Sequence, residues 1–142
     1  MKYKLFISAA GRGTRVAGLT SINKSLLPIN YEAVISKIID SYPKNLEIVI
    51  ALGHEKEVVK NFLEIRHEDR KIKFVIVKKY SGIGSGPGYT LYQCRKYLQC
   101  PFIYSSCDTI VLEKVPPPNV NWLGISKVKN TERFLIIEKK KS

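Results

Sequence analysis

The chain has 142 residues, 44% of them apolar, which is enough for one domain with a hydrophobic core and too few for two. Neither a signal peptide nor an apolar run of about 18 residues is present, so we expect a soluble, cytoplasmic protein without a membrane partner. The net charge of +12 indicates anionic partners, but basic and acidic residues are interleaved. Because no predicted helix carries a one-sided basic stripe, this pattern argues against nucleic acid as the main partner.

The apolar pattern predicts alternating strands and helices along most of the chain. Strands are predicted at Lys4 to Ala10, Leu46 to Leu52, Ile72 to Val77 and Pro101 to Ser106. The nearly continuous apolar run from Leu46 to Leu52 is typical of a strand buried on both faces of a parallel sheet. Helical spacing of apolar residues occurs at Tyr31 to Tyr42, at His54 to Ile65 and after Pro87. This alternation predicts an α/β fold, a three-layer Rossmann-like sandwich with a mostly parallel central sheet.

The pattern changes after Val115. A Pro116-Pro117-Pro118 connector precedes two short strand candidates, Trp122 to Val128 and Arg133 to Glu138, and the last residues, Lys139 to Ser142, are expected to form a turn or to be disordered. The three cysteines are spaced six and seven residues apart, which matches neither a zinc pattern nor a disulfide framework. We therefore expect reduced, mostly buried thiols.

The stretch from Leu5 to Ile29 carries the clearest chemical signal. Its apolar strand ends at Gly11-Arg12-Gly13-Thr14-Arg15, where two glycines let backbone N–H groups approach an anion closely. Lys24 adds positive charge, and no acid occurs before Glu32. A triphosphate is the commonest small ligand that such a field would bind, so we predict a nucleoside triphosphate site.

Two common phosphate motifs are excluded by missing residues. A dinucleotide fingerprint would need a glycine at Val16, and a P-loop would need a lysine at Leu19. The runs GRGTR and NKSLLPI instead resemble the G-x-G-T-R … P-K-x-L-L-P signature of the nucleotidyltransferases that make sugar nucleotides and related activated compounds. The resemblance covers roughly residues 3 to 138 and implies the nucleotide-diphospho-sugar transferase type of fold.

The resemblance implies roles for the residues of this signature. The residues implied to wrap the nucleotide are Ala9, Ala10, Gly11, Arg12, Gly13 and Thr14. Arg15 is implied to steady the β- and γ-phosphates, and Lys24 to contact the α-phosphate under attack; these two are the predicted catalytic residues. Asn23 stands where the family usually has proline, which we expect to loosen the loop before Lys24.

Asp108 is the candidate metal ligand. It follows a predicted strand and is the only carboxylate between Asp69 and Glu113, although an Asp at a strand end caps a turn more often than it binds a metal. The segment SSCDTIV resembles the family's N-G-D-x-x segment, whose Asp binds the catalytic Mg²⁺. Because a carboxylate awaiting a cation has few partners of its own, we expect replacement of Asp108 to leave the fold stable.

A second glycine-rich loop runs from Gly82 to Gly88. It resembles the family's base-recognition loop, L-G-T-A-x-A-L, and this implies contacts to the nucleotide from Gly84, Ser85 and Gly86. The alternative is a plain strand-to-helix turn. We interpret His54 as a helix-entry residue and His67 as a surface residue, and we assign chemistry to neither.

The implied function is transfer of a nucleotidyl group from an NTP to a phosphorylated acceptor, with Mg²⁺ as cofactor. The family's enzymes generally exceed 200 residues, so residues 1–115 are interpreted as a nucleotide-binding core and 116–142 as the start of an incomplete acceptor-binding part. We expect such a chain to bind nucleotide but to turn over poorly. A glycosyltransferase of similar architecture, a non-catalytic nucleotide-binding module and a basic nucleic-acid-binding module stay open as alternatives. So does the oligomeric state, a homo-oligomer included.

Overall fold

The computed structural model describes residues 2–13 and 22–128. In chain order, with η for a short 3-10 helix, the elements are β1 (Lys4–Ala9), η1 (Lys24–Leu26), β2 (Pro28–Ile29), β3 (Glu32–Ala33), α1 (Val34–Asp40), β4 (Glu47–Leu52), α2 (Lys56–Arg66), β5 (Ile72–Ile76), α3 (Pro87–Cys94), η2 (Arg95–Tyr97) and β6 (Phe102–Ser106). None of the helices in this part of the chain is long and apolar enough to cross a membrane.

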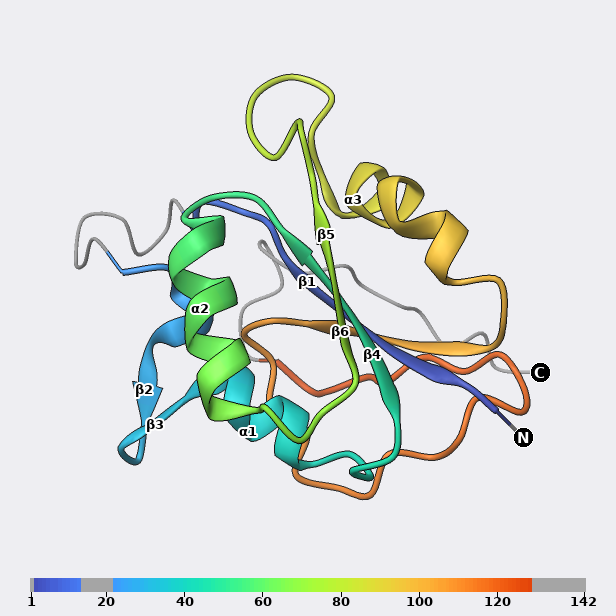
Figure 1. Cartoon of the computed structure of the whole chain (residues 1–142). Coiled ribbons are helices and arrows are strands. Elements are labelled where there is room, and N and C mark those ends of the chain that lie inside the picture. The colour runs from blue at the N-terminus through green and yellow to red at the C-terminus, as the bar shows by residue number, and fades with distance from the viewer. Residues whose placement is uncertain (1, 14–21, 129–142) are drawn as a thin grey trace.

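Parallel strands form the central sheet in the order β5-β4-β1-β6 (Figure 1). β1 lies between β4 and β6, with Ile7 in register with Ile50 on one side and Ser105 on the other. The side chains from Leu5 to Ile7 and from Ile48 to Leu52 are 0% exposed, which explains why both runs are continuously apolar. The predicted parallel sheet is confirmed.

Helices cover both faces of this sheet (Figure 1). Ile7 packs in one cluster with Ile35 of α1 and Leu63 of α2. Phe6, its neighbour in sequence, points to the opposite face and packs in a second cluster with Cys94 of α3. The predicted three-layer α/β sandwich is therefore confirmed. The four strands predicted before residue 107 and the helices predicted after His54 and Pro87 are present with small shifts of their ends.

The first predicted helix begins later than expected, at Val34 rather than Tyr31. Strands β2 and β3 precede it as an antiparallel hairpin. Asn30 and Tyr31 form its turn with φ angles of 50° and 65°, the left-handed pair that a tight two-residue hairpin turn needs. The sequence pattern missed this hairpin because strands of two residues are too short to show alternation.

The strand expected from Trp122 to Val128 is wrong. These residues form neither helix nor strand and are exposed. Neither sheet of the described residues includes them, and a strand without a paired neighbour lacks the cross-strand contacts that stabilise it. The strand expected from Arg133 to Glu138 and the chain end from Lys139 lie outside the described residues.

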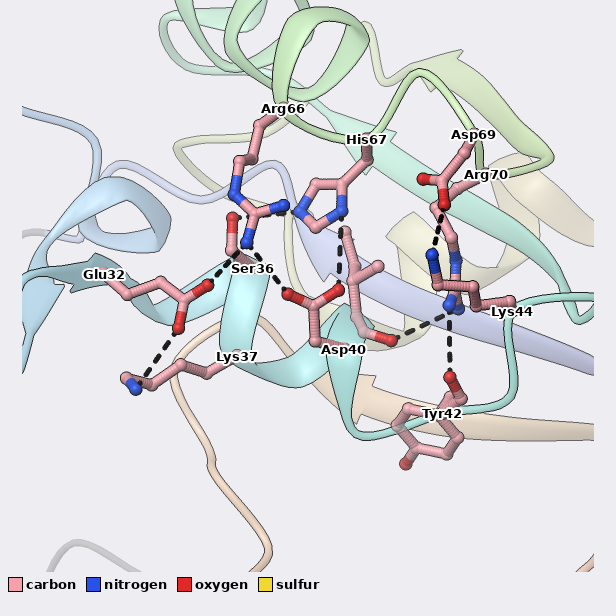
Figure 2. Close-up of polar contacts among 11 residues, drawn as sticks. Glu32, Ser36, Lys37, Asp40, Tyr42, Lys44, Arg66, His67, Asp69 and Arg70 are labelled. Carbon is pink, nitrogen blue, oxygen red and sulfur yellow. Dashed lines mark hydrogen bonds and ion pairs between the residues drawn. The ribbon is translucent and has the colours of Figure 1, made fainter.

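A polar network joins the end of α1 to the end of α2 (Figure 2). Arg66 donates a hydrogen bond to Asp40 at 3.2 Å. Arg70 is 8% exposed, and its guanidinium group donates to the carbonyl oxygens of Ile39 and Tyr42 at 3.2 and 3.1 Å. These carbonyls lie at and just beyond the last turn of α1, so Arg70 supplies donors to a helix end that lacks them.

His67 belongs to the same network and is only 2% exposed, so its interpretation as a surface residue is wrong. Its Nε2 atom lies 2.9 Å from Oγ of Ser36, and Nδ1 lies 3.7 Å from Asp40 (Figure 2). Burial lowers the pKa of His67 below its ordinary value of 6.5; Asp40 opposes this shift, and Arg66 and Arg70 add to it. The sequence predicted an exposed His67 because charged residues flank it. The packing of α2 on α1 buries it instead.

We predict that His67 makes stability depend on pH. Because its folded-state pKa is lowered, the unfolded chain takes up a proton first as the pH falls below about 6.5, and the contribution of neutral His67 is lost from there downward. One proton corresponds to a slope of at most about 1.4 kcal/mol per pH unit.

Denaturant unfolding of the wild type and of His67→Gln between about pH 5 and 8 measures this effect. The difference in free energy of unfolding between the two proteins should be largest above about pH 6.5 and shrink below it. His54→Gln is the control for loss of an imidazole. A difference that stays constant across this pH range would contradict the prediction.

Candidate functional site

The candidate site lies where β1 and β6 end side by side. The two strands are parallel neighbours, and Ser8 is in register with Ser106. Gly11 follows β1 and Asp108 follows β6, so both lie at the carboxyl edge of the sheet, where ligand-binding loops of α/β folds gather. The sheet therefore brings the first glycine loop and Asp108 to one edge.

An ion pair joins the predicted catalytic lysine to the predicted metal ligand. Nζ of Lys24 lies 2.9 Å from Oδ2 of Asp108, although 84 residues separate them in the chain. Their side chains are 25% and 46% exposed, so solvent and ligands can reach both groups. Ser106 donates its hydroxyl hydrogen to the other carboxylate oxygen, Oδ1.

These contacts hold Asp108 in its ionised form. Burial by itself raises the pKa of Asp108, but the hydrogen bond from Ser106 and the ion pair with Lys24 outweigh this and keep the pKa below its usual range. The expectation that Asp108 has few partners of its own is therefore wrong. Its neighbour Cys107 is buried, and burial raises the pKa of this thiol to about 11, so Cys107 is a packing residue rather than a nucleophile.

Asn23 fixes the loop before Lys24 instead of loosening it, which corrects the expectation from sequence. It is 1% exposed, and its Oδ1 atom accepts hydrogen bonds from both the amide and the hydroxyl of Ser25. Its Nδ2 atom donates to the carbonyl oxygen of His54 at 2.8 Å. The φ and ψ angles of −54° and 133° are ones that proline also adopts, so Asn23 keeps a proline-like backbone and adds side-chain anchors.

The two glycines of the first loop have different roles. Gly13 has a φ of +64°, and a Cβ atom there would lie 3.2 Å from Cβ of Lys24. Glycine at this position therefore lets the loop pass against the stem of the lysine. A Cβ atom on Gly11 would meet no atom within 4 Å, so the packing of the described residues does not require glycine there, as expected where a ligand approaches. Arg12 between them is exposed.

Gly53 lies at the same edge of the sheet, and the close approach that it permits was not predicted from the sequence. It directly follows β4, and a Cβ atom there would lie 2.6 Å from the carbonyl oxygen of Ala10 and 2.7 Å from Tyr80. The amide of His54 donates to the same Ala10 oxygen at 3.0 Å, and the ring of His54 lies 6.4 Å from that of Tyr80. A glycine directly after a buried strand was the available signal of this close approach.

The second glycine loop lies at the same edge of the sheet but farther along it. It connects β5 to α3, so β4 and β1 lie between it and the strand that leads to Asp108 (Figure 1). Gly84 and Gly86 have φ angles of 78° and 152°, and the hydroxyl of Ser85 donates to the carbonyl oxygen of Gly82 at 2.7 Å. This fold of the loop needs its glycines whether or not it recognises a base, so both interpretations stay open.

The structure leaves part of the predicted site untested. Thr14 and Arg15 lie outside the described residues, so their roles stay predictions. Ala9 and Ala10 are buried at the end of β1, where only their backbone groups can face a ligand. The three cysteines are free, as expected, with Cys94 and Cys107 buried.

A second constellation has the residue types of a hydrolase triad but lacks access. Ser36, His67 and Asp40 follow one another with contacts of 2.9 and 3.7 Å (Figure 2). Ser36 is 0% exposed and His67 2%, so no substrate carbonyl could reach the hydroxyl group. These residues therefore join α1 to α2 and form no active site.

Comparison with known proteins shows one curated relative and several solved structures that share the fold. No protein-family model matches the sequence. The chain is 29% identical over 138 residues to the bifunctional protein GlmU of Methanococcus vannielii, and the match covers 93% of this chain and 31% of GlmU. The chain therefore spans about a third of the length of this curated relative.

Solved structures of nucleotidyltransferases share the fold. CTP:phosphocholine cytidylyltransferase (LicC) from Streptococcus pneumoniae superposes with a TM-score of 0.70 at 23% identity, over 85% of this chain and 51% of the enzyme. UDP-glucose pyrophosphorylase, complexed with UDP-glucose, has a TM-score of 0.61 at 24% identity, over 76% of this chain and 46% of that one. A nucleotidyl transferase from Methanothermobacter thermautotroptrophicus has a TM-score of 0.58 at 20% identity, over 75% and 50% of the two chains. This chain thus has the fold of the nucleotidyltransferases, and the resemblance predicted from its motifs is confirmed.

Proposed function

We propose that this chain is the nucleotide-binding part of an enzyme that transfers a nucleotidyl group from an NTP to a phosphorylated acceptor, such as a sugar-1-phosphate, and releases pyrophosphate. The contact between Lys24 and Asp108, beside the glycine loop that follows β1, is the observation that carries this proposal. The comparisons support it, because the structural neighbours include a cytidylyltransferase and a pyrophosphorylase.

Lys24 would change partners when the nucleotide binds. Its ammonium group would leave the carboxylate of Asp108 for an oxygen of the α-phosphate, which is an equally good charged acceptor. Arg12 and Arg15 would hold the outer phosphates, and the amide groups of the loop at Gly11 would approach them closely. Asn23 would keep Lys24 in place during this exchange.

We propose that Asp108 binds Mg²⁺ together with phosphate oxygens of the nucleotide. The Asp108 carboxylate suits this role because it is ionised and half-exposed. Mg²⁺ is usually bound by one or two protein carboxylates when a substrate supplies the other oxygen ligands. The described residues contain no group of three or more His, Cys, Asp or Glu side chains that could hold a metal, so the remaining ligands would come from the nucleotide and water. When bound, the cation would neutralise phosphate charge.

The proposed reaction needs little beyond positioning and charge. An oxygen of the acceptor phosphate forms a bond to the α-phosphorus, and the bond from that phosphorus to the oxygen bridging to the β-phosphate breaks. Pyrophosphate leaves with the electron pair of the broken bond. Because the attacking phosphate is already anionic, no general base is required, and Lys24 and Arg15 act on the charge that develops.

Neither a glycosyltransferase nor a non-catalytic nucleotide-binding module is favoured over this function by the described residues. A glycosyltransferase of similar architecture would need a second carboxylate after Asp108, and Thr109 and Ile110 do not supply it. A non-catalytic nucleotide-binding module would bind the same ligand without turnover. We place the proposed reaction in the cytoplasm, where NTPs are available and where free cysteines such as these stay reduced.

We predict that an NTP stabilises the chain in a Mg²⁺-dependent way. A nucleotide at about 100 times its Kd should raise the free energy of unfolding by about 2.7 kcal/mol. Lys24→Ala should weaken binding by roughly 1.5–3 kcal/mol, because it removes a charge-assisted contact. Asp108→Asn should remove the Mg²⁺ dependence and cost the nucleotide-free protein no more than about 1 kcal/mol, because the ion pair is partly exposed.

Thermal shift with each of the four common NTPs, with and without Mg²⁺, measures these effects. Lys44→Ala is the control, because Lys44 is exposed and pairs with Asp69 on the α1–α2 side. If every NTP leaves the melting curve of the wild type unmoved at millimolar concentration, the proposed function is wrong.

Pyrophosphate release tests for catalysis. With each NTP and a mixture of sugar-1-phosphates and phosphocholine-like acceptors, we expect slow release that depends on the acceptor and on Lys24. Orientation of the acceptor can contribute roughly 7–11 kcal/mol, and few described residues are available to hold it. Robust release would show that the acceptor site lies within this chain, and no release under any condition would favour the non-catalytic module.

We predict that Asn23 sets the position of Lys24. Asn23→Ala should destabilise the fold by about 1–3 kcal/mol, because the buried amide of Ser25 loses its acceptor, and should weaken NTP binding. Asn23→Pro loses the same hydrogen bonds but restricts φ, so it should retain more NTP affinity than Asn23→Ala. Thermal shift with the stabilising NTP compares the variants, and equal affinities would show that rigidity at Asn23 does not matter.

A further inference from the structure

A cluster of cations and aromatic rings surrounds η2, far along the chain from the loop that follows β1. We define the η2 face as Lys73 of β5, Tyr92 of α3, and Arg95, Lys96 and Tyr97 of η2. The ammonium groups of Lys73 and Lys96 lie 5.1 and 4.9 Å from the ring centre of Tyr97. The guanidinium carbon of Arg95 lies 3.9 Å from the ring centre of Tyr92.

The charged residues of the η2 face are all basic. The chain contains seven Lys or Arg residues and no acid between Asp69 and Asp108, and three of the seven, Lys73, Arg95 and Lys96, belong to this face. Among the described residues, Lys73, Arg95 and Lys96 form no ion pair with an acid. Neighbouring cations without acidic partners repel one another, and a bound anion would reduce this repulsion.

Two open hollows flank η2 and meet at Gln99, which lines both. One, of about 370 Å³, is mainly apolar and is lined by Leu91, Tyr92 and Phe102, with Arg95 at its side. Tyr92 is 55% exposed, so its ring is accessible to a planar ligand. This hollow could bind a nucleobase, because it combines an apolar lining with an aromatic ring that is contacted by a cation.

The other hollow, of about 240 Å³, is lined by Lys2, Lys4 and Lys96, with Glu47 as its acid. Glu47 pairs with Lys4 at 2.8 Å, and Lys4 also donates to the carbonyl oxygen of Tyr97, so this pair belongs to the structure of the hollow. Lys2 and Lys96 then leave a net positive charge that suits a phosphate group. A basic hollow beside an aromatic one matches the alternation of phosphate and base along a nucleic-acid strand.

We propose that the η2 face binds single-stranded nucleic acid. Bases stack in the hollow of Tyr92, and the phosphates of the strand contact Lys96 and Lys73. A double helix keeps its bases stacked on one another and so cannot use the aromatic hollow. The sequence pattern indicated against nucleic acid as a partner, because no single predicted helix carries a basic stripe. In the fold, the basic cluster is assembled from three different elements, β5, α3 and η2.

Fluorescence anisotropy with a labelled single-stranded RNA of about 12 nucleotides, and with DNA of the same sequence, tests the proposal. We expect salt-dependent binding to the wild type. Lys73→Gln/Lys96→Gln should reduce the slope of log affinity against log salt by about 1.4, because each phosphate that a lysine neutralises adds about 0.7 to that slope. Tyr92→Ala should weaken binding roughly tenfold, whereas Tyr92→Phe, which keeps the ring, should not.

Matched controls separate this face from general charge and from the nucleotide site. Lys44→Gln/Lys60→Gln removes the same charge on the α1–α2 side and should leave binding nearly unchanged. Lys24→Ala should also keep it, and the NTP response of Lys73→Gln/Lys96→Gln should equal that of the wild type. Melting curves confirm that each variant is folded.

Several results would overturn the proposal. They are absence of saturable binding at low salt, an equal loss in both double-lysine variants, and loss of binding in Lys24→Ala alone. Equal binding of a duplex with no effect of Tyr92→Ala would show that the hollow does not receive bases. Displacement of the RNA by polyglutamate at lower charge concentration than by unlabelled RNA would assign the face to an acidic protein instead.

Discussion

The pairing of β1 with a strand on each side is the constraint on which the rest of this structure depends. Ala9 is in register with Leu52 and Ser8 with Ser106, so the ends of all three strands are set together. A shift of one residue would turn every side chain of β1 to the opposite face of the sheet, and Phe6 and Ile7 would then lose the clusters in which they pack. The relative position of Gly11 and Asp108 is therefore a consequence of core packing.

Charge interactions and hydrogen bonds position the residues of the candidate site at the end of this sheet. The ion pair with Lys24 helps to keep the partly buried Asp108 ionised, and both side chains remain accessible to a ligand. Asn23 holds the lysine through hydrogen bonds buried under the loop, and Gly13 lets the loop lie against its stem. Rigid support of a charged side chain is what positioning of a phosphate requires.

Access distinguishes this site from chemically similar groups elsewhere in the protein. Ser36 and His67 are in hydrogen-bonding contact, as in a hydrolase, but both are sealed between α1 and α2. Burial likewise raises the pKa of Cys107 and keeps its thiol unreactive, although it directly precedes Asp108. Residue type and spacing alone could not separate these roles, because burial depends on which elements pack together.

The sequence by itself determined the alternation of the main strands and helices and the parallel sheet, and it named Lys24 and Asp108 as candidates, because apolar periodicity and motif spacing are local properties. Only the tertiary structure decided that these two residues are already paired, that His67 is buried and that Lys73 lies beside Tyr97. The short hairpin before α1 and the absence of a strand at 122–128 also depended on it. Each of these depends on contacts, made or missing, between residues distant in the chain, and no local pattern encodes which distant partner a side chain will meet.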